Sequence, residues 1–201
     1  RTQAALLEAM GEAQVTIGDT SYTLPQHFLV IATQNPFDGQ GTFPLPHAQL
    51  DRFLFKIKIG HPSKSEEIAI LQRFQGDIQT PDLSNISKIL TPADIKRIHS
   101  IIKGITIEEK IIHYIAEIVD ATRNHGQVFL GASPRASLAI MRSAKANAAV
   151  MGRDFVTPDD VQFVVAPVLN HRLILTPEAE MENTQTEDIV KEILRTIEVP
   201  R

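Results

Sequence analysis

The chain has 201 residues, of which 43% are hydrophobic and 22% charged, and its formal net charge is −4. This composition is typical of a globular protein, and no apolar run in the sequence approaches the length that spans a membrane. The absence of cysteine excludes disulfide bonds and thiolate metal sites and fits a reducing compartment, so we expect a cytoplasmic protein without direct membrane insertion. The negative net charge gives no general attraction to nucleic acid or to anionic lipid.

The first residues predict a helix that starts directly at the beginning of the sequence. The chain begins with Arg1 rather than methionine, and Thr2 is placed to cap an amphipathic helix whose apolar positions follow at once: Ala4, Leu6, Leu7 and Met10. A natural protein rarely begins inside so well formed an element, so we expect the chain to be the back part of a longer protein.

The N-terminal part has the pattern of an incomplete α/β domain. Residues 13–18 and 20–24 alternate on either side of a Gly-Asp turn, which predicts a β-hairpin. Residues 28–33 form an apolar run without alternation, which is typical of a strand covered on both faces. Residues 53–59 alternate as a strand near a sheet edge does. Two strands and a hairpin are too few for a closed core, which again indicates a missing front portion.

The remaining sequence has the 3.6-residue period of helices. Helix starts are marked by a cap with an acidic residue or a proline: Ser63 with Glu66, Thr91-Pro92, Ser133-Pro134, Thr157-Pro158, and Thr184 with Glu187. Residues 108–123 carry one apolar stripe, made of Ile111, Ile112, Ile115, Ile118 and Val119. The predicted fold is therefore α/β plus all-α, with an α/β part over residues 1–61 and a helical domain over residues 62–201.

Most enzymatic signatures are absent from the sequence. The seven histidines show no metal-ligand spacing, and no serine lies in a nucleophile elbow. Asn35, at the end of the predicted buried strand, allows two interpretations. It is either a turn former ahead of Pro36 or a polar contact for a ligand at the strand's carboxyl end.

Two arginines also allow two interpretations each. Arg52 forms either a surface ion pair with Asp51 or a neighbour, or a functional contact. Arg135 lies in the first turn of its predicted helix, where a cation opposes the helix dipole but where anions also bind. Position alone does not decide between the structural and the functional interpretation.

Seven ordered stretches nevertheless give the chain a clear resemblance. They are TQAALLEAM (2–10), QVTI (14–17), VIATQNP (30–36), GTFPLPHAQLDRFLFKI (41–57), GASPRASL (131–138), GRDFVTPDDV (152–161) and LNHRLILTPEAE (169–180). Together they resemble the MoxR family of AAA+ ATPases. The resemblance implies the C-terminal part of an AAA+ α/β core, with a pre-sensor hairpin, a sensor-1 strand and an edge strand, followed by a helical lid domain.

The resemblance also implies roles for matching positions. Asn35 matches sensor 1, which helps to place the attacking water near the γ-phosphate of ATP. Arg52 matches the arginine finger, which reaches the nucleotide of a neighbouring subunit. Arg135 matches sensor 2, through which the lid contacts its own subunit's nucleotide. The implied cofactors are ATP and Mg²⁺, and the implied assembly is a homo-oligomer, usually a hexameric ring. The implied activity is chaperone-like remodelling or maturation of partner complexes, in some cases with a von Willebrand factor A-domain partner.

The chain departs from the family pattern in three respects. The sequence contains no G-x-x-x-x-G-K-[ST], so the phosphate-cradling loop is absent, and no buried strand ends in the Asp-Glu pair that holds Mg²⁺. In the family both precede the residue that matches Arg1, and we expect residues 1–201 alone to be inactive. His47 stands where an acidic residue is expected, and we assign it no role.

Two other functions compete with this expectation. The chain would act as a non-catalytic lid and oligomerisation module if it binds no nucleotide of its own. A nucleic-acid role would use the hairpin VTIGDTSYTL, but this segment has no Lys or Arg for phosphate contacts, so we expect no nucleic-acid partner.

Overall fold

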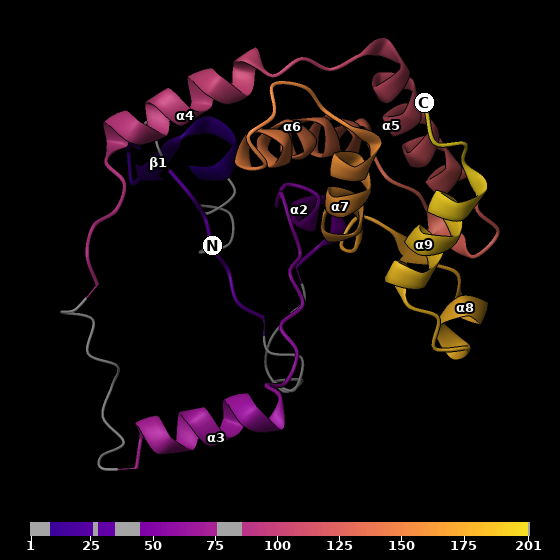
Figure 1. Cartoon of the computed structure of the whole chain (residues 1–201), viewed down its shortest axis with the longest axis horizontal. Coiled ribbons are helices and arrows are strands. Elements are labelled where there is room, and N and C mark those ends of the chain that lie inside the picture. The colour runs from indigo at the N-terminus through magenta and orange to yellow at the C-terminus, as the bar shows by residue number, and fades with distance from the viewer. Residues whose placement is uncertain (1–8, 26–27, 35–44, 76–85, 201) are drawn as a thin grey trace.

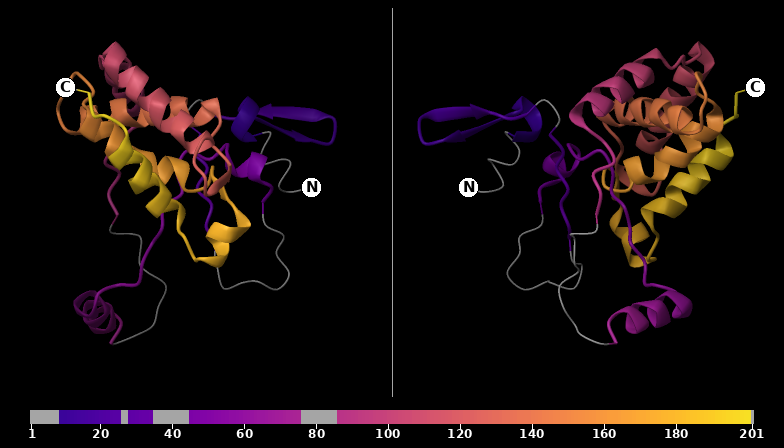
Figure 2. Two further views of the ribbon diagram at one scale, coloured as in Figure 1. Left: turned by 90° about the vertical axis from the view of Figure 1, so that its right-hand side faces the viewer. Right: turned by 60° about the vertical axis from the view of Figure 1, so that its left-hand side comes forward.

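The computed structural model describes residues 9–25, 28–34, 45–75 and 86–200. Most of the described helices form one body; one helix stands apart from it in Figure 1, and a β-hairpin extends away from it in Figure 2. The helical segment that begins the described chain continues to residue 12, and its predicted cap, Thr2, lies outside the described residues.

The β-hairpin predicted around Gly18 is confirmed. Strands β1 (Gln14–Ile17) and β2 (Thr20–Thr23) pair antiparallel, with Val15 opposite Tyr22. Gly18 has a φ of +62°, a left-handed conformation that a residue without a Cβ adopts at little cost. Val15, Ile17 and Tyr22 share one face because side chains alternate along a strand. Figure 2 shows the hairpin extending away from the helical body.

The two other predicted strands, the sensor-1 strand at 28–33 and the edge strand at 53–59, are not strands in the structure. Residues 28–34 and 55–63 have no regular secondary structure, and four of their isoleucines and leucines are exposed: Leu29 (79%), Ile31 (83%), Ile57 (75%) and Ile59 (94%). A strand exists only where a neighbour completes its hydrogen-bond ladder, and no described segment lies beside either run as a paired strand. The apolar pattern predicted burial but not the partner that burial requires.

Two helices begin where their caps predicted. Helix α3 (Lys64–Arg73) starts after Ser63 with a capping box to Glu66, and α4 (Pro92–Gly104) starts after Thr91 with a capping box to Asp94. Neither helix contains a buried residue. Helix α3 lies apart from the body in both views (Figures 1 and 2).

The body packs four helices around one core. These are α5 (Glu109–Arg123), α6 (Pro134–Val150), α7 (Pro158–Leu169) and α9 (Thr186–Thr196). The predicted stripe of α5 is confirmed at Ile111, Ile115, Ile118 and Val119, which are at most 4% exposed. It is wrong at Ile112, which is 46% exposed because one residue turns the helix by about 100° away from the core.

Short elements were not predicted from the sequence. Strands β3 (Val128–Leu130) and β4 (Ile174–Leu175) pair antiparallel, and α8 (Pro177–Met181) follows them. Helix α9 is preceded by Gln185 rather than by the predicted cap Thr184. Elements of two to five residues carry too little periodicity to be recognised from sequence. No helix in the described ranges is long and apolar enough to cross a membrane.

An ion pair joins the end of α6 to the start of α7. Arg153 donates from Nη1 to Asp160 Oδ2 (2.7 Å) and from Nη2 to Oδ1 (2.6 Å). Asp160 is 1% exposed and also accepts from Asn147 Nδ2 and from the Thr157 backbone N–H. Burial raises the pKa of Asp160, but the hydrogen bonds from Arg153, Thr157 and Asn147 outweigh it and hold that pKa well below its usual range. The stretch GRDFVTPDDV therefore serves the fold.

Candidate functional site

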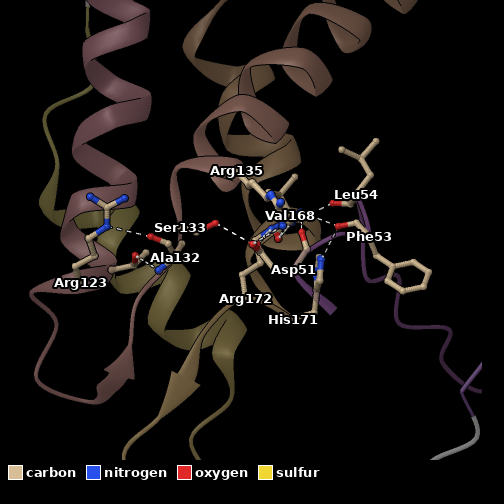
Figure 3. A network of polar contacts seen from close by, with 11 residues as sticks. Asp51, Phe53, Leu54, Arg123, Ala132, Ser133, Arg135, Val168, His171 and Arg172 are labelled. Atoms are coloured by element: carbon tan, nitrogen blue, oxygen red, sulfur yellow. Dashed lines mark hydrogen bonds and ion pairs between the residues drawn. The ribbon is translucent and has the colours of Figure 1, made fainter. Parts of the chain in front are cut away.

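Residues 51–54, which we call the strap, follow the short helix α2 (His47–Leu50) and lie against the end of α7 (Figure 1). The carboxylate of Asp51 gathers three side chains from the helical body. It accepts from Arg172 Nε (2.9 Å) and from Ser133 Oγ (3.0 Å), and Arg135 Nη1 lies 3.8 Å away. Figure 3 shows these groups converging on Asp51. One carboxylate thus links the N-terminal part of the chain to two separate segments of the body.

Arg172 makes the most contacts in this cluster. Its Nη2 donates to the carbonyls of Asp51 (3.0 Å) and Phe53 (2.6 Å), and its Nη1 donates to those of Leu54 (3.2 Å) and Val168. The side chain is 3% exposed. Burial lowers the pKa of Arg172 while Asp51 raises it, and the guanidinium stays charged because its ordinary pKa is so high. A buried guanidinium with this many acceptors fixes the strap in one geometry.

The same residues complete the C-terminus of α7. The last four carbonyls of a helix have no partner within it. Here Ala166 O accepts from Asn170 N, Pro167 O from Lys56 N (2.9 Å), and Leu169 O from Arg172 N. Val168 O accepts from the Arg172 side chain. All four carbonyls are therefore satisfied, two of them by Lys56 N–H and the Arg172 guanidinium.

His171 provides a second contact to the strap. Its Nε2 lies 2.9 Å from the Phe53 carbonyl, and because a carbonyl only accepts, Nε2 carries the proton. Burial lowers the pKa of His171 to about 4, and the positive charges of Arg172 and Lys56 act in the same direction. The ring is thus neutral at pH 7. Its Nδ1 is buried and has no hydrogen-bond partner in the described part of the chain.

The start of α6 is positioned by α5. A Cβ at Gly131 would lie 2.6 Å from Arg123 Cα, so only glycine permits this close approach. The next residue, Ala132, donates its N–H to Thr122 Oγ1 (3.0 Å). Ser133 precedes the helix as predicted, but its hydroxyl does not cap the helix and donates to Asp51 instead. Arg135 follows in the first turn with its side chain 58% exposed.

The structure places two of the three predicted site residues. Arg52 is exposed in the middle of the strap, and a Cβ at Gly11 would lie 3.2 Å from its Nη1, so the first helical segment lies beside the guanidinium. Arg135 contacts the carboxylate of the residue directly before Arg52. Asn35 lies outside the described residues.

Asp51, His171 and Arg172 were missed as functional candidates. Their signal was present in the sequence, since an arginine followed by the apolar run Leu-Ile-Leu is placed to be buried and then needs an acidic partner. Arg135 and Arg172 both contact Asp51, and the next residue in the chain is the exposed Arg52, so positive charge exceeds negative charge here, as suits phosphate oxygens. The described residues contain no group of histidines and carboxylates able to hold a metal ion. The described residues thus fit a contact to a polyphosphate, but they do not form a binding site for its Mg²⁺ ion.

Comparison with known proteins gives the family of the chain. Residues 1–55 match the model of the ATPase family associated with various cellular activities, and residues 120–193 match the AAA lid domain. Chaperone MoxR1 of Mycobacterium tuberculosis is 40% identical over 210 residues, covering 100% of this chain and 54% of the relative. The chain belongs to the MoxR-type AAA+ ATPases.

Two further relatives of this MoxR-type chain support the same family. The uncharacterized protein YeaC of Bacillus subtilis is 42% identical over 200 residues, covering 100% of this chain and 62% of YeaC. The crystal structure of a putative ATPase from Cytophaga hutchinsonii superposes with a TM-score of 0.87 at 40% identity, covering 99% of this chain and 62% of that one. The MoxR-type chain therefore spans between half and two thirds of the length of these relatives, and its helical body corresponds to an AAA lid.

Proposed function

We propose that the chain is the C-terminal portion of a ring-forming ATPase that couples ATP hydrolysis to chaperone-like remodelling of partner protein complexes. Residues 1–61 complete its α/β core and residues 62–201 form its lid. The observation that carries this proposal is the cluster on Asp51, which ties the residue before Arg52 to Arg135 and Arg172. The proposal is supported by the name of a relative, a chaperone.

In this proposal the two exposed arginines act on different nucleotides. Phosphoryl transfer depends on neutralising the charge of the transferred group rather than on covalent chemistry, so a cation supplied by a neighbour strongly raises turnover. Arg52 extends from the fixed strap toward the nucleotide of the adjacent subunit. Arg135 extends from the lid toward the nucleotide of its own subunit. Asn35 orients the attacking water.

The proposed assembly is a hexameric ring in the cytoplasm, with a von Willebrand factor A-domain protein as a candidate partner. ATP and Mg²⁺ are its cofactors. Their phosphate-binding loop and Mg²⁺-holding acids are absent from residues 1–201, so the proposal requires a longer protein that supplies both.

Mixed rings test the role of Arg52. In the longer protein, Arg52→Ala should leave ATP affinity nearly unchanged and lower turnover by about 1,000-fold, as loss of an arginine finger does. Subunits that lack the P-loop lysine but keep Arg52 are then mixed with Arg52→Ala subunits. We expect activity to return at interfaces where an intact nucleotide site meets an intact Arg52. Mixed rings without any return would show that Arg52 acts within its own subunit or only on structure.

The alternative is a non-catalytic lid and interface module. It is favoured by the missing P-loop and by the exposed apolar side chains of Leu29, Ile31 and Ile57, which suit a protein interface. ATP titration of residues 1–201 and of the longer protein discriminates the two. The proposal predicts saturable binding only in the longer protein, and the alternative predicts binding in neither.

A further inference from the structure

The two residues that flank Arg52 in the chain, Asp51 and Phe53, are both bound by side chains of the lid. On one side, Asp51 is bound through its carboxylate and its carbonyl by Arg172. On the other side, the carbonyl of Phe53 accepts from Arg172 Nη2 and from His171 Nε2. These contacts join residues about 120 positions apart in sequence (Figure 3), and the exposed Arg52 is the residue between Asp51 and Phe53 in the chain.

We call these contacts of Arg172 and His171 with Asp51 and Phe53 the bracket. The bracket restrains the backbone on both sides of Arg52 and leaves its side chain exposed. A side chain on a segment without helix or strand, such as 51–59, would lose entropy on reaching a neighbour's phosphate. Fixing the flanking carbonyls in advance removes much of this cost, which is how supporting contacts align a reacting group. Arg172 donates from all three of its nitrogens, whereas a lysine donates from a single nitrogen, so Arg172→Lys would keep the charge and lose most of these contacts.

We infer that Arg172 is a positioning residue that sets where Arg52 is presented to the neighbouring subunit. This inference rests on the proposed in-trans role of Arg52. Because Arg172 belongs to the lid, the bracket also makes the lid of one subunit the support for the arginine that serves the next subunit's nucleotide. The lid thus acts on two nucleotide sites, on its own through Arg135 and on its neighbour's through Arg172 and the strap.

A double-mutant cycle in the longer protein tests this inference. Arg172→Lys should lower kcat roughly ten- to a hundredfold, with ATP affinity unchanged within about twofold, since the loss comes from misplacement and not from binding. Added to Arg52→Ala, it should cause little further loss, because an absent side chain cannot be misplaced. Arg153→Lys is the matched control, because it weakens another ion pair of the lid that lies away from the strap. It should lower melting temperature without lowering kcat.

Mixed rings give the deciding result. Arg172→Lys subunits combined with subunits that lack the P-loop lysine but keep Arg52 and Arg172 should regain turnover. Asp51→Asn, which weakens the same bracket, should behave in the same way and replaces Arg172→Lys if that variant does not fold.

Four results would overturn the inference. Turnover of Arg172→Lys equal to wild type per folded subunit would make Arg172 a structural residue alone. Multiplying losses in the double variant, or no rescue in mixed rings, would show that Arg172 acts independently of Arg52. Normal turnover of Arg52→Ala would overturn the proposed in-trans role itself and, with it, the need for a positioning residue.

Discussion

Arg135 Nη1 lies 3.8 Å from Asp51 Oδ2, on a carboxylate that Arg172 already neutralises. This long contact involves an arginine side chain that is 58% exposed, and such pairs contribute little to stability. Arg135 is therefore able to leave Asp51 for a phosphate at little cost. The carboxylate keeps Arg172 and Ser133 when this happens.

Arg135→Ala in the longer protein should weaken ATP binding more than ADP binding. The difference arises if Arg135 contacts the γ-phosphate, because only a differential contact lets nucleotide drive lid closure. Melting temperature should barely change. Affinities measured by titration with both nucleotides check this expectation. Equal losses for ATP and ADP would refute γ-phosphate sensing, and unfolding of the variant would make Arg135 a structural residue.

Asp160→Asn should destabilise the protein by about 1–3 kcal/mol, because the buried carboxylate that accepts from Asn147, from the Thr157 N–H and from Arg153 would be lost. Asp159→Asn, on the exposed side of the same helical turn, is the matched control and should change the free energy of unfolding by about 0.5 kcal/mol or less. Urea unfolding of both variants makes the comparison. Equal effects at the two positions would show that the ion pair does not stabilise the packing of α6 against α7.

Gly131→Ala should destabilise the protein by about 1–3 kcal/mol, since the new Cβ would meet the backbone of Arg123. The clash would also shift Ala132 and Ser133 and so disturb the contact to Asp51. Gly126→Ala serves as the control, because no atom lies within 4 Å of a Cβ there. Thermal unfolding compares the two. An unchanged melting temperature for Gly131→Ala would mean that the junction adapts to a side chain.

Stability should fall as pH falls from about 6.5 to 4. The pKa of His171 is lowered from 6.5 to about 4 in the folded state, so over this range the unfolded chain binds the proton more readily. This group costs no stability above pH 6.5, and the loss that it causes grows to at most about 3 kcal/mol by pH 4. Unfolding by urea across this range, with His171→Gln as comparison, checks the sign. A slope that persists unchanged in His171→Gln would assign the effect to other groups.

Local signals in the sequence predicted the helices well. Ser63 begins its helix with the predicted capping box to Glu66, and Thr91 begins its helix ahead of Pro92 as predicted, because a cap and its partners lie within one turn. The runs at 28–33 and 53–59 were predicted as strands and are not, because strand pairing depends on a distant partner that no local pattern specifies.

The candidate site was predicted only in part, for the same reason. Arg52 and Arg135 were singled out by their positions, and their proposed roles come from the resemblance to MoxR-type stretches. Arg172 was missed because its carboxylate partner is 121 positions away in the sequence. The hydroxyl of Ser133 was expected to cap α6, but it is drawn to Asp51, a contact that appears only once the strap is folded against the lid.

The most direct test is the structure of the assembled longer protein bound to a non-hydrolysable ATP analogue. The account predicts that the Arg52 guanidinium lies within about 3 Å of a γ-phosphate oxygen bound to the neighbouring subunit, a charge-assisted hydrogen-bond distance. It also predicts that Arg172 still brackets the strap in that state. A structure in which Arg52 points away from every nucleotide, while another cation reaches the γ-phosphate, would contradict the account.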